Sequence, residues 1–141
     1  MAFQPLVLKL IANYSKYTAL ISVGIIWALS WLAVGISPYL SMLMAGIALC
    51  VSQLIFAFGE MVHAPTSPAL TQELAPEHIR GRASALTSLQ WGISGIAGPA
   101  VAGLMIGANL EQLWVLTMAI GVLAPIPLFA YLKRTTEKAK K

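Results

Sequence analysis

Long apolar runs separated by short polar stretches dominate the pattern of this chain. Charged side chains are absent from residues 17–59, 83–110 and 112–132, which are runs of 43, 28 and 21 residues. A helix crosses the hydrocarbon core of a bilayer with about 20 apolar residues. The first run is long enough for two crossings, and Ser37-Pro38-Tyr39 interrupts it near its middle. The pattern therefore predicts four transmembrane helices, over residues 17–37, 40–60, 83–107 and 113–132.

The main polar stretch is residues 59–82, GEMVHAPTSPALTQELAPEHIRGR, which holds both histidines and three of the five acids. We expect the second helix to extend beyond residue 60 into a cytoplasmic loop over residues 61–82. Pro65 and Pro68 each remove a backbone donor and distort a helix there. Pro76 followed by Glu77 predicts a new helix start, because proline suits the first turn and an acid there complements the helix dipole.

Composition and charge support a membrane protein. Hydrophobic residues make up 58% of the chain and charged residues 10%, whereas soluble domains carry about 25% charged residues. All nine lysines and arginines lie in the interfacial segment 1–16, in the central loop or in the basic tail 133–141. The positive-inside rule makes that side cytoplasmic, so both termini are predicted to be cytoplasmic. The charge pattern thus reports topology and disfavours a nucleic-acid-binding patch; the tail is predicted to be solvated rather than held on anionic lipid.

One face of the second predicted helix carries side chains at intervals of four, three, four and three residues: Leu49, Gln53, Phe56, Glu60 and His63. Ionisable groups in a membrane usually face a bundle interior or an aqueous cavity. Counting ~1.5 Å per residue from Leu40 places Glu60 ~30 Å along the helix, near the cytoplasmic boundary. Glu60 is then either a proton-carrying or gate-forming carboxylate or, the interpretation that the pattern favours, an interfacial acid paired with a base for structural reasons.

The third predicted helix is rich in small residues. One stripe consists of Gly95, Pro99, Gly103 and Gly107, with Gly98 beside the proline, and a second of Ser84, Ser88 and Gly92. Such stripes let helix backbones approach closely. A separate face carries Thr87, Gln90 and Ser94, which either line a cavity or make hydrogen bonds between helices. The fourth predicted helix is apolar and interrupted by Pro125 and Pro127, which indicates a peripheral position.

Several chemistries find no support in the sequence. Cys50 is the single cysteine, and His63 and His78 are 15 residues apart without further ligands nearby, so we expect neither a metal site nor a cofactor. The chain contains no aspartate and no plausible relay for a catalytic hydroxyl, so we expect no enzymatic activity.

The ordered motifs of residues 59–105 resemble a known transporter family. GEM at 59–61, Pro65, LAPE at 74–77, RGRA at 80–83, WG at 91–92 and GPAVAGLM at 98–105 resemble the tenth and eleventh helices of the major facilitator superfamily, with the closest likeness to bacterial drug:proton antiporters. Residues 4–17 resemble the loop before the ninth helix, and the last predicted helix with its basic tail resembles the twelfth.

The resemblance implies the fold and the site. Members have twelve helices in two halves, with substrate between the halves, so this chain resembles helices nine to twelve of the C-terminal half. It implies a multi-pass protein of the cell (plasma) membrane that exchanges a small-molecule substrate for protons and needs no cofactor. It also implies a cavity bordered by the second and third helices, with Gln53, Phe56, Thr87, Gln90, Trp91 and Ser94 as lining residues. We hypothesise that Glu60 contacts Lys9 or Arg80 at the inner gate, and that Arg82 lies beside this pair. Opposite charges couple strongly at ~4–6 Å, so a Glu60 carboxylate much farther than this from every base would contradict the hypothesis.

Three functions remain open at this stage. The first is a fragment of a proton-coupled multidrug or small-molecule efflux transporter, working with the missing helices of a truncated or split gene. The second is a small four-helix multidrug transporter acting as a dimer, a class whose proton-binding glutamate lies in the first helix. The third is a membrane assembly partner that does not transport.

Overall fold

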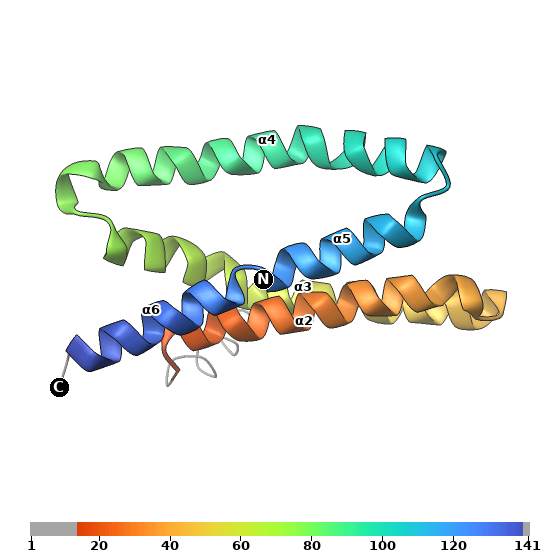
Figure 1. Cartoon of the computed structure of the whole chain (residues 1–141), viewed down its shortest axis with the longest axis horizontal. Coiled ribbons are helices and arrows are strands. Elements are labelled where there is room, and N and C mark those ends of the chain that lie inside the picture. The colour runs from red at the N-terminus through yellow and green to blue at the C-terminus, as the bar shows by residue number, and fades with distance from the viewer. Residues whose placement is uncertain (1–13, 140–141) are drawn as a thin grey trace.

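The protein is all-helical throughout the part described by its computed structural model, residues 14–139. Its helices are α2 (Lys16–Ile36), η1 (Ser37–Tyr39), α3 (Met42–Leu74), η2 (Glu77–Ile79), α4 (Arg80–Gly107), α5 (Glu111–Leu123) and α6 (Ile126–Ala139) (Figure 1). Four stretches are long and apolar enough to cross a membrane: Lys16–Tyr39, Met42–Leu74, Glu77–Gly107 and Glu111–Thr136. The predicted all-α fold with four long apolar helices is therefore confirmed.

Local chemistry sets the helix ends. The Ser15 hydroxyl caps α2 by accepting a hydrogen bond from the Thr18 amide at 3.2 Å. α4 ends at Gly107, and two residues later Asn109 has a left-handed φ of 57°, a conformation that asparagine tolerates better than most residues. The Leu110 amide donates to the Met105 carbonyl at 2.8 Å and the Asn109 amide to the Ile106 carbonyl at 3.0 Å, which is a Schellman motif. The chain then turns sharply into α5.

The second predicted helix extends far beyond residue 60. α3 continues as one 33-residue helix through Pro65 and Pro68, so residues 61–74 of the expected loop segment 61–82 are helical. The break comes at Pro76, which precedes η2 and then α4. The last long apolar stretch is divided at Ala124 and Pro125 into α5 and α6. α3 is therefore about 50 Å long at ~1.5 Å per residue, longer than the ~30 Å hydrocarbon core.

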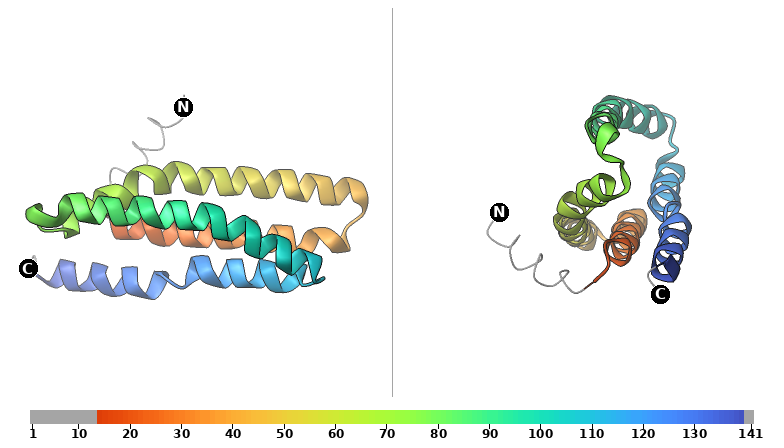
Figure 2. Two further views of the ribbon diagram at one scale, coloured as in Figure 1. Left: turned by 90° about the horizontal axis from the view of Figure 1, so that it is seen from above. Right: turned by 90° about the vertical axis from the view of Figure 1, so that its left-hand side faces the viewer.

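α2 is the centre of the packed part of the molecule. It contacts α3 on one side and α5 and α6 on the other (Figures 1 and 2). Ala19 and Val23 of α2 form a buried cluster with Val62 of α3. On the α5 side, a Cβ added at Gly24 would lie 2.9 Å from the Val122 carbonyl oxygen, so this glycine permits a close approach of the two helices.

α4 lies apart from this packed part. It is connected to α3 through η2 at one end and to α5 at the other, and the end-on view in Figure 2 places it away from α2. No residue of α4 is buried by the described residues of the chain.

One end of the molecule collects the described basic residues. The start of α2, the α3–α4 connection and the C-terminal part of α6 all lie there (Figure 1). We call it the basic end; its described bases are Lys16, Arg80, Arg82, Lys133, Arg134 and Lys138.

Candidate functional site

Trp27 joins α2 to α3 at the centre of the packed part. Its indole Nε1–H donates to the Phe56 carbonyl at 3.2 Å, and its ring stacks on the Phe56 ring with centroids 5.3 Å apart. The ring also lies 5.0 Å from the imidazole of His63. Gly59 lies beneath the indole: a Cβ there would be 2.5 Å from Trp27 Nε1. The two helices approach this closely because residue 59 has no side chain.

His63 extends this contact to α4. Its imidazole lies 6.2 Å, centroid to centroid, from the Trp91 ring in an edge-to-face arrangement. One imidazole thus lies between two indoles that come from α2 and α4. Glu60 precedes His63 by three residues on α3, so the two side chains share one face of the helix. We call Trp27, Phe56, Glu60, His63 and Trp91 the central cluster.

The central cluster lies at the middle of the helices. Trp27 is at the centre of the 24-residue stretch Lys16–Tyr39. Gly59 touches Trp27, so Glu60 next to it lies at the same level. The predicted position of Glu60 near the cytoplasmic boundary stays a prediction, because it depends on where the bilayer lies along these helices. The packing of α3 against α2 sets only the level of Glu60 relative to α2.

The expected contact between Glu60 and Arg80 is corrected. Arg80 lies 3.6 Å from the Glu77 carboxylate, and its Nε donates to the Ala75 carbonyl at 3.3 Å. Glu60 forms no salt bridge within residues 14–139. The reason is distance along the helix, because α3 continues for 14 residues beyond Glu60, or about 20 Å. Lys9, the other expected partner, lies outside the described residues, and Arg82 is exposed at the start of α4.

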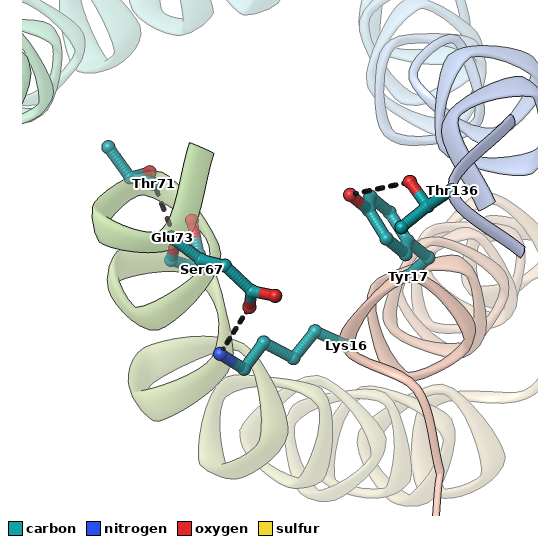
Figure 3. A network of polar contacts seen from close by, with 6 residues as sticks. All are labelled: Lys16, Tyr17, Ser67, Thr71, Glu73 and Thr136. Carbon is teal, nitrogen blue, oxygen red and sulfur yellow. Dashed lines mark hydrogen bonds and ion pairs between the residues drawn. The ribbon is translucent and has the colours of Figure 1, made fainter. Parts of the chain in front are cut away.

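The basic end is tied by a different pair, which the sequence did not indicate. Lys16 Nζ donates to Glu73 Oε2 at 2.6 Å, joining the first residue of α2 to the end of α3 (Figure 3). The Tyr17 hydroxyl lies 3.5 Å from the Thr136 hydroxyl and so adds α6 to this contact. The only available signal was that residues 16 and 73 have opposite charges at the two ends of a predicted antiparallel helix pair.

The predicted cavity-lining residues fall on both sides of α3. Gln53 and Phe56 line a cleft of about 240 Å³ with Ser30, Trp31 and Val34 of α2. Thr87 and Trp91 line a cleft of about 290 Å³ between α3 and α4; its other lining residues are Pro68, Thr71, Gln72, Ser84 and Ser88. Gln90 and Ser94 are exposed on α4. The structure thus places four of the six predicted lining residues in two clefts on opposite sides of α3 and leaves Gln90 and Ser94 outside both.

The glycines of α4 have no neighbouring helix in the described part of the chain. A Cβ added at Gly95, Gly98 or Gly103 would meet nothing within 4 Å, and Pro99 beside them is exposed. The role of this stripe in helix packing stays a prediction about surfaces beyond residues 14–139. Among those residues, no three His, Cys, Asp or Glu side chains gather as metal ligands.

Comparison with known proteins places the chain in a family. A family model described as Major Facilitator Superfamily matches it over residues 1–141, which is its entire length. The chain belongs to this superfamily. No curated protein and no solved structure matches the chain. Superfamily members are membrane transporters, and the four long apolar helices agree with a multi-pass membrane protein.

Proposed function

We propose that this superfamily member exports small molecules in exchange for protons, with Glu60 and His63 binding and releasing the proton. One observation carries the proposal: a carboxylate and an imidazole, one turn apart on α3, lie level with the centre of α2. Ionisable groups at membrane depth are costly and mark ion pathways or substrate sites. Because His63 touches rings of both α2 and α4, a change in its charge acts on two neighbouring helices.

The substrate path in this proposal follows α3. Aromatic rings with a few polar groups are typical of small-molecule sites. The two clefts beside α3 supply such a lining, with Phe56 and Gln53 in one and Trp91 and Thr87 in the other. Gln90 and Ser94 of α4 extend the polar side chains toward its open face.

We also propose that further membrane helices cover α4 when the protein works. The observation in favour is that α4, the least apolar of the four long helices, has none of its apolar window buried. Its glycines and hydroxyls gain little from lipid but let another helix approach closely. Membrane helices of another polypeptide would cover the open face of α4. The alternative is a second copy of this chain, in a dimer of four-helix subunits.

The proposed orientation places the basic end at the cytoplasmic face of the cell membrane. The positive-inside rule supports this, because the six described bases gather at one end of the molecule. Glu111, at the start of α5, then lies at the opposite face.

Transport in proteoliposomes tests the proposal. The chain is reconstituted, a pH gradient is imposed, and accumulation of the dye ethidium is followed in wild type and in Glu60→Gln. In whichever assembly transports the dye, the chain alone or the chain with further helices, we expect Glu60→Gln to abolish gradient-driven transport. The matched control is Glu77→Gln, which removes an exposed acid at the basic end and should leave transport intact. Equal transport by Glu60→Gln and wild type would exclude Glu60 as the proton carrier.

A spectroscopic measurement keeps the proposal testable when further helices are required for transport. Protonated imidazole quenches indole fluorescence, so the emission of Trp27 and Trp91 should follow the protonation of His63. We expect a pH-dependent change that disappears in His63→Gln and shifts its midpoint in Glu60→Gln. Transport by the chain alone would instead refute the requirement for further helices.

A further inference from the structure

A recess of about 340 Å³ lies at the basic end, where the start of α2, the end of α3 and the middle of α6 meet. It is separate from the central cluster, because Glu73 lies 13 residues beyond Glu60 on α3, about 20 Å at ~1.5 Å per residue. In Figure 3, the Lys16–Glu73 pair and the Tyr17–Thr136 contact border an open space from opposite sides.

The charges of this recess favour an anion. Lys16 and Lys133 line it from α2 and α6, and Glu73 is the one acid among its lining residues. Lys16 is held by Glu73 at 2.6 Å, and an ammonium group has three donors, so this contact leaves Lys16 two others. Lys133 also has an interaction of its own, and the three donors of its ammonium group likewise allow a further contact. Two ammonium groups from two helices can therefore donate to one anion in the recess.

Neutral groups in the recess suit the same ligand. Ser15 and Tyr17 contribute hydroxyl groups that can donate to phosphate oxygens, whereas the Thr136 hydroxyl donates to the Leu132 carbonyl at 2.8 Å. The recess also includes the N-terminus of α2, a 21-residue helix whose dipole favours negative charge there. Tyr14 and Leu70 add apolar surface beside these polar groups.

We propose that this recess binds the phosphate group of an anionic phospholipid headgroup. The long apolar helices end here, so the recess opens where headgroups meet the acyl region, and basic pockets between membrane helices are suited to such headgroups. Its ligand ties the inner ends of α2, α3 and α6 together. Free inorganic phosphate offers the same chemistry, and the experiment separates the two sources.

The experiment measures binding of phosphatidylglycerol and phosphatidylcholine to the full chain in detergent, through the rise in its thermal unfolding temperature. We expect wild type to bind phosphatidylglycerol in preference to phosphatidylcholine. Lys133→Gln should weaken that binding by about tenfold or more, since a hydrogen bond to a charged group contributes ~1.5–3 kcal/mol. The matched control is Lys138→Gln, which removes the same charge from the same helix outside the recess lining and should change affinity by less than about twofold.

Each further outcome decides for or against the site. Equal weakening in Lys133→Gln and Lys138→Gln, or equal binding of both lipids, would overturn the proposal in favour of diffuse attraction. Lys133→Arg, which restores the charge, should recover binding and so separates the site from a folding defect. Inorganic phosphate at millimolar concentration should not displace the lipid; displacement would overturn the headgroup assignment and identify free phosphate as the ligand.

Discussion

α2 and α4 are both long enough to cross a membrane, yet the molecule uses them in opposite ways. In the most apolar 18-residue segment of each helix, a third of α2 is buried, whereas none of α4 is buried. The mean hydropathy of these segments is 2.2 for α2 and 1.3 for α4, so the less apolar helix is the more exposed one. Lipid contact does not account for this difference. It instead supports the proposal that the open face of α4 contacts other protein.

The glycines of the two regions make the same contrast. At Gly24 and Gly59 a methyl group would collide with a neighbouring helix, so those glycines are required by contacts that exist. At Gly95 and Gly103 a methyl group would meet open space. Glycine within a helix costs roughly 0.5–1 kcal/mol relative to alanine. The unpacked glycines of α4 therefore carry a cost, and a partner surface of the kind we propose would offset it.

Removal of the Trp27 side chain should have the largest effect on stability. Trp27→Ala removes the ring contacts with Phe56 and His63 and the hydrogen bond to the Phe56 carbonyl. We expect the free energy of unfolding in detergent to fall by about 3 kcal/mol, at the lower end for tryptophan because the indole is only partly buried. Trp91→Ala is the control: Trp91 is 55% exposed and its removal should cost clearly less. Equal losses would mean that α4 is packed as firmly as α2.

Gly59→Ala should have the next largest effect. The added methyl group meets Trp27, which is itself held by Phe56 and His63, and overpacking of this kind costs about 1–3 kcal/mol. Gly95→Ala should have the opposite sign, with a gain of up to ~1 kcal/mol from helix propensity. Chemical denaturation of both variants measures the difference. A loss of stability in Gly95→Ala would show that a partner already covers α4 in the purified protein.

The ion pair at the start of α2 should contribute less. A double-mutant cycle with Lys16→Met and Glu73→Gln should give a coupling free energy of about 0.2–1 kcal/mol, because both side chains are around half exposed. The coupling should weaken with added salt. Arg80 and Glu77, at 3.6 Å and more exposed, provide a comparison pair within the α4 region and should couple more weakly still.

The smallest effect is expected on the open face of α4. Ile96 is 79% exposed, and Ile96→Ala should change the free energy of unfolding by less than about 0.5 kcal/mol. The comparison in the packed part is Val62→Ala on α3. It removes two buried methyl groups and should lower the free energy of unfolding more than Ile96→Ala does. A cysteine at position 96 that cross-links to a second copy in membranes would favour the dimer over helices encoded elsewhere.

The sequence by itself determined the number of long helices and the collection of bases at one end. It also indicated the break at Pro76. These features depend on local requirements: an apolar run in a membrane satisfies its backbone by forming a helix, and proline and capping side chains act on the residues beside them. For the same reason the all-α fold was predictable, as was an extension of the second helix beyond residue 60, although not that it reaches Leu74.

Only the tertiary structure decided which residues meet across the helices. Three features depend on the register of α3 along α2. They are the level of Glu60 relative to α2, the contact of Trp27 with Gly59 and the Lys16–Glu73 ion pair. That register is set by shape complementarity at the contact, because Gly59 has no side chain and so leaves room for the Trp27 indole. Helical periodicity shows which residues share a face, but not which residue of the neighbouring helix lies opposite. Helical periodicity therefore placed Glu60 on the same face as His63, and only the packing of α3 on α2 placed that face against Trp27.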